Sequence, residues 1–281
     1  MLAEALEFLD VRPDGVYVDA TTGLGGHTAA IAARLGTGTV IALDRDAESL
    51  DLARKNTAAW AQRIRYRQAQ FSELRPALDA LGIGKIDGLL ADLGVSRYQL
   101  TEAERGFSLA SSGPLDMRMD RSQALTAAEL VNTLNEKELA DLIYRLGEEG
   151  RSRQISRALV RARPLRDTQH LARVIEGATP RTGKLHPATQ TFMALRRAVN
   201  RETEELDALL EAAPDAMAAG GRLVTIAFMS LEDRQVKEAF RGLARQGRAR
   251  LLTKHVVKPG REEIVSNPAS RSAKLRAVEM G

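Results

Sequence analysis

The sequence predicts an α/β protein in which a parallel β-sheet is interrupted by a block of helices. Apolar segments typical of strands alternate with helical segments over residues 16–94, and this alternation favours a parallel sheet with right-handed crossovers. Residues 101–185 contain no convincing strand pattern, whereas a buried strand is indicated again at 218–228. We therefore expect an α/β domain formed by residues 1–100 and 186–281, with residues 101–185 as an inserted helical domain.

Composition narrows the class of protein. The chain has 281 residues, which is enough for one large or two moderate domains with a real core. It contains no cysteine, which excludes disulfides and thiolate metal sites and fits an intracellular protein. No apolar run approaches the roughly 18 residues of a membrane span, and the acidic start of the chain reads as an amphipathic helix rather than a signal peptide. We expect a cytoplasmic protein that does not bind membranes.

The predicted sheet is organised around a strand–turn–helix unit at residues 16–35. Its apolar strand ends at Asp19, a glycine-rich turn follows over residues 21–26 (TTGLGG), and a helix begins at His27. Glycines allow the backbone to approach a ligand closely, and the free amides at the start of a helix face any negative group that the ligand carries. This arrangement is typical of a site for a nucleotide-like cofactor.

Two cofactors fit this unit, and a tight turn without any ligand is the alternative. A dinucleotide site needs Gly-x-Gly-x-x-Gly, but Thr28 stands at the third glycine position. The amino-acid end of S-adenosylmethionine needs only a short nest of amides, which Gly25, Gly26 and His27 could supply. For either cofactor, Asp44 at the end of the next strand would accept hydrogen bonds from the ribose hydroxyls. The turn alone favours S-adenosylmethionine without excluding the dinucleotide.

Three predicted strands end in or near an acidic residue: Asp19, Asp44 and Asp92. The carboxyl ends of parallel strands meet at one edge of a sheet, which is where open sheets bind ligands. The strand over residues 85–94 is a nearly continuous apolar run, as expected for a strand covered on both faces. Phe71, at the end of the strand predicted over residues 64–71, would lie against an adenine ring or belong to the core.

If the cofactor is S-adenosylmethionine, Asp92 is the residue to which we assign a role in methyl transfer. In amino-methyltransferases, a polar residue at this strand end accepts hydrogen bonds from an exocyclic amine, whose lone pair is otherwise delocalised into the ring. Attack on the sulfonium methyl then depends mainly on position and desolvation, and no metal is needed because the leaving group is neutral sulfur. Contact with the amino group of the cofactor, or capping of a turn, are the alternative roles.

The insertion carries a basic helix. We expect two helices over residues 126–147, followed by helices at 151–163 and 168–178. In the helix expected at 151–163, Arg153, Arg157 and Arg161 recur every four residues, so they share one face. Apolar residues lie roughly opposite that face. A row of guanidinium groups about 6 Å apart can track phosphates. A solvated surface row without a partner is the alternative.

The remaining elements complete the sheet. After the insertion we expect a long helix at roughly 187–211, the buried strand at 218–228, and closing strands at 249–257 and 274–280 that form an antiparallel pair.

Over nearly its whole length the chain resembles the bacterial methyltransferases that modify the exocyclic N4 amine of a cytosine in 16S ribosomal RNA. The matching stretches occur in family order: DATTGLGGHT (19–28), ALDRD (42–46), FSEL (71–74), DGLLADLGVS (87–96), AERGFSLASSGPLDMRMD (103–120), GEEGRSRQISRALV (147–160), HPATQTFMALRRAVN (186–200), SLEDRQVK (230–237) and NPASRSAKLR (267–276). The fifth stretch is long and far more specific than the glycine turn. The resemblance implies a Rossmann-like class I methyltransferase sheet, an inserted RNA-facing helical domain, and S-adenosylmethionine as the cofactor.

The resemblance also implies roles for individual residues. Seven of them would bind the cofactor: Gly25, Gly26 and His27 at its amino-acid end, Asp44 at the ribose, Phe71 against the adenine, and Asp92 and Gln99 near the reacting methyl. On the substrate side, Asp116 in the segment DMRMD (116–120) would help to shape the cytosine slot, or form a salt-bridged turn. His186 is a candidate general base, or a residue that caps the following helix.

The expected partner is 16S ribosomal RNA within the small ribosomal subunit. The sequence does not specify an oligomeric state, and a homodimer is compatible with it. A DNA amino-methyltransferase is a second hypothesis, although residues 92–95 lack the (D/N/S)PPY type of motif. A third hypothesis is a non-catalytic RNA-binding assembly factor that has kept the fold.

Overall fold

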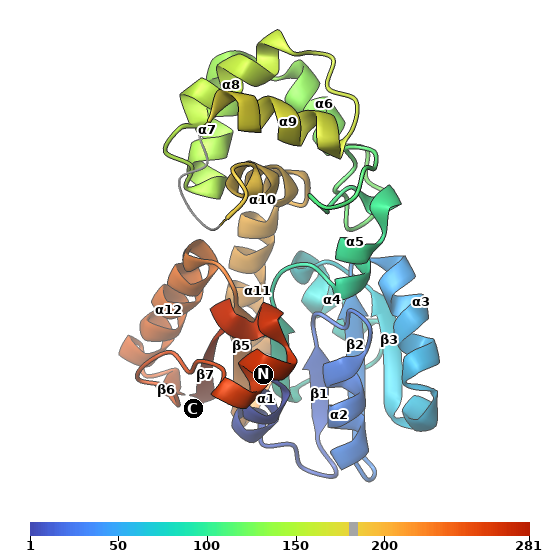
Figure 1. Cartoon of the computed structure of the whole chain (residues 1–281). Helices are drawn as coiled ribbons and strands as arrows, with labels where there is room; N and C mark the ends of the chain where they lie inside the picture. Colours follow the sequence, from blue (N-terminus) through green and yellow to red (C-terminus); the bar gives the residue numbers. More distant parts are fainter. Residues whose placement is uncertain (180–184) are drawn as a thin grey trace. The chain divides into compact units, whose positions relative to one another are not determined.

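The computed structural model describes residues 1–179 and 185–281, which form two units (Figure 1). The sheet unit comprises residues 1–95 and 203–281, and the helical unit comprises residues 96–202. A helical segment therefore interrupts an α/β segment, which is the organisation that the order of elements in the sequence predicts.

The sheet unit contains one seven-stranded sheet with the order β3-β2-β1-β4-β5-β7-β6. Neighbouring strands from β3 to β5 are parallel, and β7 runs antiparallel to both β5 and β6. The expected α/β fold and the closing antiparallel pair are both confirmed. The strands are β1 (Val16–Asp19), β2 (Thr39–Asp44), β3 (Ile64–Gln68), β4 (Ile86–Asp92), β5 (Met217–Ala227), β6 (Ala249–Leu251) and β7 (Lys274–Met280).

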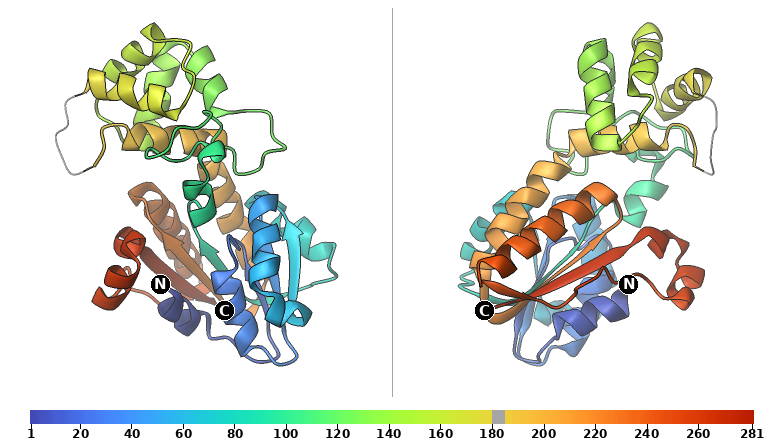
Figure 2. Two further views of the ribbon diagram at one scale, coloured as in Figure 1. Left: turned by 45° about the vertical axis from the view of Figure 1, so that its right-hand side comes forward. Right: turned by 90° about the vertical axis from the view of Figure 1, so that its left-hand side faces the viewer.

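Helices cover both faces of this sheet. The helices of the sheet unit are α1 (Leu2–Leu9), α2 (Gly26–Arg34), α3 (Ala47–Asn56), α4 (Leu74–Asp79), α11 (Glu202–Ala216), α12 (Ser230–Arg245) and α13 (Arg261–Ser266), with 3-10 turns η1 (Ala58–Arg63), η2 (Phe71–Glu73) and η4 (Pro268–Ser272). Figure 2 shows α11 and α12 on one side of the sheet and α1 on the other.

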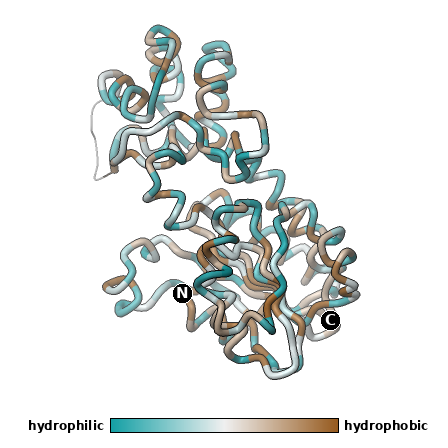
Figure 3. The backbone as a smooth tube through the Cα atoms, turned by 90° about the vertical axis from the view of Figure 1, so that its right-hand side faces the viewer, coloured by the Kyte–Doolittle hydropathy of each residue, from teal (hydrophilic) through white to brown (hydrophobic). Residues whose placement is uncertain are grey.

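Side chains alternate between the two faces along each central strand. In β2, Ile41 and Leu43 pack with residues of α4, α11 and α12, whereas Val40 and Ala42 pack with residues of α1 and α2. All four side chains are buried, and burial of one such aliphatic side chain contributes about 1.5–3 kcal/mol. Figure 3 shows apolar residues gathered along the strands of this sheet. A sheet buried on both faces leaves its strand ends as the place for ligands.

The helical unit contains α5 (Arg97–Thr101), η3 (Ala103–Arg105), α6 (Ala127–Thr133), α7 (Glu136–Gly147), α8 (Ser152–Arg161), α9 (Thr168–Ala178) and α10 (Thr189–Val199). A capping box formed by Thr126 and Glu129 starts α6. Helix α7 packs against both α8 and α10, and α8 packs against α9. Ile155 and Leu159 of α8 are fully buried, as expected for residues opposite the arginine row.

The structure divides the chain at 202/203 where the sequence analysis expects 185/186, and at 95/96 where it expects 100/101. The single helix expected at 187–211 is two helices, α10 and α11, and the units divide between Glu202 and Thr203. Asn200 explains both differences, because its side chain accepts the amide of Met119 at 2.7 Å and donates to the carbonyl of Met117 at 2.7 Å. Arg201 then adopts a left-handed φ of 49°, which ends the helix. These contacts join α10 to the helical unit.

Two expected strands are shorter than the pattern suggests. The segment at 249–257 forms only the three residues of β6, and Val257 adds one isolated bridge to Leu275. Lys254 and His255 between them are exposed, so no buried face requires the strand to continue. Similarly, β3 ends at Gln68, and Phe71 begins a 3-10 turn rather than ending the strand.

Candidate active site at the carboxyl edge of the sheet

The glycine turn between β1 and α2 is shaped by its own backbone. Gly25 has a φ of 89°, a region that side chains with a Cβ rarely adopt, and a Cβ there would lie 2.7 Å from Cγ2 of Thr57. A Cβ on Gly26 would meet nothing within 4 Å, because this residue borders open space. Helix α2 begins at Gly26, so its first free amides face that space. The turn therefore combines a required glycine with an open cradle.

The side chain of Asp19 holds this turn in place through hydrogen bonds. This side chain is fully buried and accepts hydrogen bonds from the Thr28 hydroxyl at 2.6 Å and the Thr21 amide at 3.2 Å. Burial raises the pKa of Asp19 to about 6, and the hydrogen bonds from Thr28 and Thr21 only partly oppose that effect. Asp19 thus ties β1 to the first turn of α2. The sequence places it at the site edge without indicating this role.

Asp44 lies at the end of β2, beside the same turn. Its two carboxylate oxygens accept the amides of Gly23 at 2.7 Å and Asp46 at 2.9 Å. Burial raises the pKa of Asp44 to about 6, again against the effect of those amides. Each oxygen of a carboxylate can accept more than one hydrogen bond, so Asp44 retains acceptor capacity for a ligand.

A cavity of about 260 Å³ lies within the sheet unit at the ends of β4 and β5. Gly26, His27 and Asp92 form one part of its wall. The rest of the wall comes from the first two residues, the end of β5 and the segment around α13 and η4: Met1, Leu2, Ile226, Phe228, Glu263, Asn267, Ala269, Ser270 and Ala273. The structure therefore brings three of the predicted cofactor residues to one cavity, and one of them, Asp92, is also the predicted catalytic residue.

Asp92 and His27 form a loosely paired dyad in this cavity. Nδ1 of His27 lies 3.7 Å from Oδ2 of Asp92. Burial raises the pKa of Asp92 to about 6 although His27 opposes it, and burial lowers the pKa of His27 although Asp92 opposes it. Within the described part of the chain, Oδ1 of Asp92 and Nε2 of His27 are buried without a hydrogen-bond partner. Each buried atom of this kind requires an explanation, and a ligand is one.

Of the other two predicted cofactor residues, Phe71 is not part of the cavity wall, and Gln99 belongs to the helical unit. Phe71 is half-buried and packs against the core beneath α4, while the neighbouring Ser72 amide donates to Glu205 at 2.9 Å. Gln99 is buried in the helical unit, where its side chain accepts the Ser96 amide at 3.0 Å and completes a capping box on α5. Their cofactor roles stay predictions.

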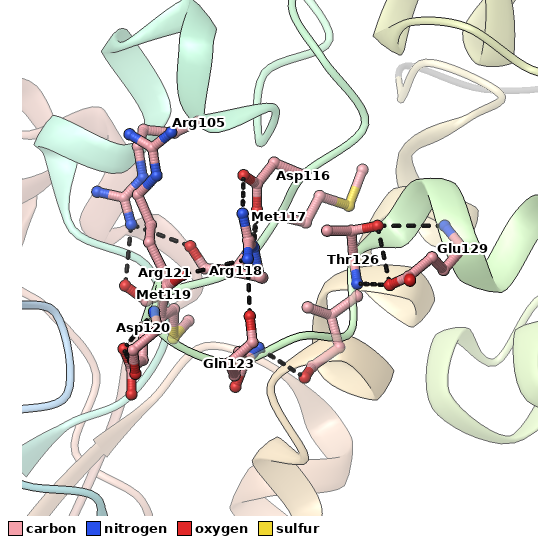
Figure 4. Close-up of polar contacts among 12 residues, drawn as sticks. Arg105, Asp116, Met117, Arg118, Met119, Asp120, Arg121, Gln123, Thr126 and Glu129 are labelled. Atoms are coloured by element: carbon pink, nitrogen blue, oxygen red, sulfur yellow. Dashed lines mark hydrogen bonds and ion pairs between the residues drawn. The ribbon is translucent and has the colours of Figure 1, made fainter.

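The segment Asp116–Asp120 is held by its own hydrogen bonds, as Figure 4 shows. Arg118 contacts both oxygens of Asp116, through Nε at 2.7 Å and Nη2 at 2.9 Å. Arg105, which is buried, donates to the carbonyls of Arg118 and Met119 at 2.9 Å each. Asp120 instead accepts the amide and hydroxyl of Ser122. The salt-bridged turn therefore forms between Asp116 and Arg118, and a role in a cytosine slot stays a prediction.

The arginine row of α8 is exposed as expected. Arg157 forms an ion pair with Glu136 at 3.4 Å, whereas Arg153 and Arg161 contact no acidic side chain among the described residues.

His186 has both ring nitrogens engaged: Nδ1 accepts the Ala188 amide at 3.1 Å, and Nε2 lies 2.9 Å from Glu176. That geometry supports the capping role of His186 more than the general-base role.

Sequence analysis missed most of the cavity wall. Phe228, Glu263 and Asn267 line the cavity, yet none was a candidate. Glu263 accepts the Met1 ammonium at 3.0 Å and the Asn267 amide at 3.1 Å, and these bonds lower its pKa. The family-like stretch NPASRSAKLR (267–276) was the one signal that could have directed attention to this segment.

The site fits S-adenosylmethionine on the observations above. The open space at Gly26 leaves room for the amino-acid end beside the first amides of α2, and Asp44 keeps acceptor capacity for ribose hydroxyls. Among residues 1–179 and 185–281, no group of three or more His, Asp or Glu side chains could hold a metal ion. In the same residues, no helix is long and apolar enough to span a membrane.

Comparison with known proteins agrees with a site for S-adenosylmethionine. Residues 1–281 match the model of the MraW methylase family. A protein named ribosomal RNA small subunit methyltransferase H from Solibacter usitatus is 61% identical, covering 100% of this chain and 98% of that protein. A protein of the same name from Acidobacterium capsulatum is 50% identical, with 99% of this chain and 96% of that protein covered.

A solved structure from Clostridium thermocellum, provisionally described as an rRNA methylase, matches with a TM-score of 0.51 at 11% identity, covering 100% of this chain and 97% of that one. At that identity it supports the Rossmann-like fold. The match to the family model over the whole chain, together with relatives of high identity, shows more: the chain belongs to the MraW methylase family and is an S-adenosylmethionine-dependent methyltransferase.

Proposed function

We propose that the protein transfers the methyl group of S-adenosylmethionine to the N4 exocyclic amine of a cytosine in 16S ribosomal RNA of the small subunit. The observation that carries this proposal is the buried, unpartnered Oδ1 of Asp92 in a cavity beside the glycine cradle. The name shared by the close relatives, ribosomal RNA small subunit methyltransferase H, supports the substrate.

The cradle would bind the amino-acid end of the cofactor. The backbone amides of Gly25, Gly26 and His27 would contact the carboxylate, because these donors lie at the start of α2, where the helix dipole favours negative charge. Asp44 would accept hydrogen bonds from the ribose, and Phe71 would contact the adenine. Bound there, S-adenosylmethionine supplies an electrophilic methyl group on a sulfonium centre.

Asp92 would act on the amine of the base. As a carboxylate it accepts an N–H of the exocyclic amine, which returns electron density to the nitrogen and fixes its direction of approach. Its amide donates to the Thr21 hydroxyl at 2.6 Å, so the end of β4 is fastened to the glycine turn. The same contact keeps the carboxylate at a constant place relative to the cradle. Gln99 stays a predicted further residue of this pocket.

The RNA contacts proposed outside the cavity come from the helical unit. Arg153 and Arg161 are exposed on one face of α8 and can contact phosphates, with Arg157 joining them if its pair with Glu136 opens. Asp116 and His186 are the remaining predicted substrate residues.

The proposed substrate implies a cytoplasmic location. A homodimer is a further proposal, which sedimentation of the purified protein would test.

The test is methyl transfer from radiolabelled cofactor to small subunits isolated from a strain that lacks the gene. We expect the wild type to label one cytosine at N4, and Asp92→Asn to lower kcat by about 10²–10³-fold while its affinity for the cofactor stays within a few-fold. Asp51→Asn on the exposed face of α3 is the matched control and should be fully active.

Parallel reactions use free 16S RNA and duplex DNA. Labelling of duplex DNA in place of ribosomal RNA would identify a DNA amino-methyltransferase instead. If the wild type bound subunits and the cofactor but transferred no methyl group, the protein would be a binding factor and the proposed function would be wrong.

A further inference from the structure

We propose that the His27 imidazole accepts the proton that the exocyclic amine loses during methyl transfer, with Asp92 orienting the imidazole through Nδ1. This inference rests on the function proposed above. It explains a feature which that function leaves open, namely that Nε2 of His27 is buried at the cavity wall without a partner among the described residues.

The backbone and the side chain of His27 can serve two different groups. Its amide belongs to the first turn of α2, which faces the cofactor. Its imidazole instead extends toward the end of β4, where Nδ1 lies 3.7 Å from Oδ2 of Asp92. Asp92 therefore presents Oδ2 to the imidazole and leaves Oδ1 for the amine. A base bound in the cavity would meet an acceptor from each residue.

The charges around His27 favour a neutral imidazole. Burial is the main cause of its lowered pKa, and the Met1 ammonium lowers it further. Asp92 and Glu263 act in the opposite direction. At pH 7 the ring is therefore neutral and carries one proton. With that proton on Nδ1, directed at Asp92, the lone pair of Nε2 is left without a partner among the described residues and can accept a proton.

The chemical step balances without any further reactant. The N4 lone pair forms a bond to the methyl carbon while the carbon–sulfur bond breaks, and its electrons remain on sulfur as a neutral thioether. N4 then carries a positive charge and one proton too many. Nε2 of His27 takes that proton, and the imidazolium formed lies beside the Asp92 carboxylate, which stabilises it. Water removes the proton when the product leaves.

The variant His27→Gln separates proton acceptance from cofactor binding. Gln keeps the backbone amide and a polar side chain but has no basic nitrogen. We expect kcat on undermodified small subunits to fall by about 10²-fold or more, with the cofactor Kd within threefold of wild type. His255→Gln is the matched control, because His255 is exposed in the same unit and should be dispensable.

Chemical rescue distinguishes a base from a structural residue. In His27→Ala, added imidazole should restore part of kcat, and more basic imidazoles should restore more of it. A kcat of His27→Gln within threefold of wild type overturns the inference. A parallel loss of cofactor affinity and kcat without rescue also overturns it, because His27 would then be a cofactor ligand only.

Nitrogen-15 NMR of the protein without cofactor provides a readout that needs no activity. We expect the Nδ1–H tautomer for His27, and Asp92→Asn should lower the His27 pKa further. A dominant Nε2–H tautomer in the wild type would overturn the inference. If the wild type transferred no methyl group at all, the proposed function would fail, whereas activity in both wild type and His27→Gln would remove only the role of His27.

Discussion

Gly25 and Gly26 are adjacent, yet a methyl group on each would meet different surroundings. Gly25→Ala would place a Cβ 2.7 Å from Thr57 Cγ2 at a φ of 89°, so we expect a loss of stability of roughly 1–3 kcal/mol. Gly26→Ala should leave the melting temperature nearly unchanged, since its Cβ meets nothing. That Cβ would still enter the cavity wall, so cofactor affinity should fall in both variants.

Melting curves and calorimetric titration with S-adenosylhomocysteine measure the two effects separately. Equal destabilisation by both alanines would contradict the distinction. Cofactor binding unchanged in Gly26→Ala would show that the cradle is not where the amino-acid end lies.

At the scale of single residues, the sequence predicted the polar groups that end parallel strands. Asp19, Asp44 and Asp92 could be found because the period of a strand and its last residue are local features. Glu263 and Asn267 could not be found in this way, since they lie in a short exposed helix after β6 and reach the cavity only through long-range folding. The chemistry of His27 was also hidden, because its sequence context predicts only the backbone role.

At the scale of elements, removing positive charges from α8 tests whether this helix binds RNA. Arg153→Gln combined with Arg161→Gln removes two exposed charges that have no acidic partner among the described residues. If both contact phosphates, the salt slope of subunit binding should fall by roughly 1.4–1.8, since each contact contributes about 0.7–0.9. KM for subunits should rise, while the affinity for the cofactor should stay unchanged.

A matched loss of charge on the sheet unit controls for net charge. Arg65 and Arg67 are exposed on the edge strand β3, and Arg65→Gln with Arg67→Gln also removes two charges. Binding at several salt concentrations should show no comparable change for this control. An equal change in both double variants would mean that overall charge, rather than the face of α8, sets the affinity.

Most elements followed from the sequence, and the failures have identifiable causes. Helix α7 and strands β4 and β7 were predicted because their apolar periodicity is long and is bounded by caps or turns. The break between α10 and α11 has no glycine or proline to mark it. It depends on Asn200 bonding to a backbone more than eighty residues earlier, and no local rule detects such a contact.

At the scale of the molecule, three carboxylates at the carboxyl edge of the sheet lower the free energy of unfolding at neutral pH. Their protonation in acid should restore that free energy. The pKa values of Asp19, Asp44 and Asp92 are each raised to about 6 by burial, from 3.8 in an unfolded chain. Between pH 7.5 and 5 the folded protein takes up protons that the unfolded chain does not, so the free energy of unfolding should increase on acidification. For fully buried Asp19 the full effect is roughly 3 kcal/mol, of which about half, roughly 1.4 kcal/mol, falls between pH 7.5 and 5.

Melting temperatures from pH 5.0 to 7.5 in the absence of cofactor check this sign. Carboxylates with lowered pKa values, such as Asp116 and Glu279, lose their contribution only at lower pH and should not mask the trend. The lowered pKa of His27 acts in the opposite direction in this pH range, but it is one group against three carboxylates. Asp19→Asn should flatten the profile, since a neutral side chain gains nothing from acid. A melting temperature that rises steadily toward pH 7.5 would contradict the prediction.

The division of the sheet across the chain has a consequence during synthesis. Residues 1–202 supply four of the seven strands, and the next strand, β5, begins only at Met217. Until it leaves the ribosome, the side of β4 that will pair with β5 is an open, apolar edge, which is a template for association with other chains. At about 5–20 residues per second, translation of residues 96–202 prolongs that interval by roughly 5–20 seconds. A nascent chain is therefore most prone to aggregate while its helices are being made, so slower elongation there should lower the soluble yield.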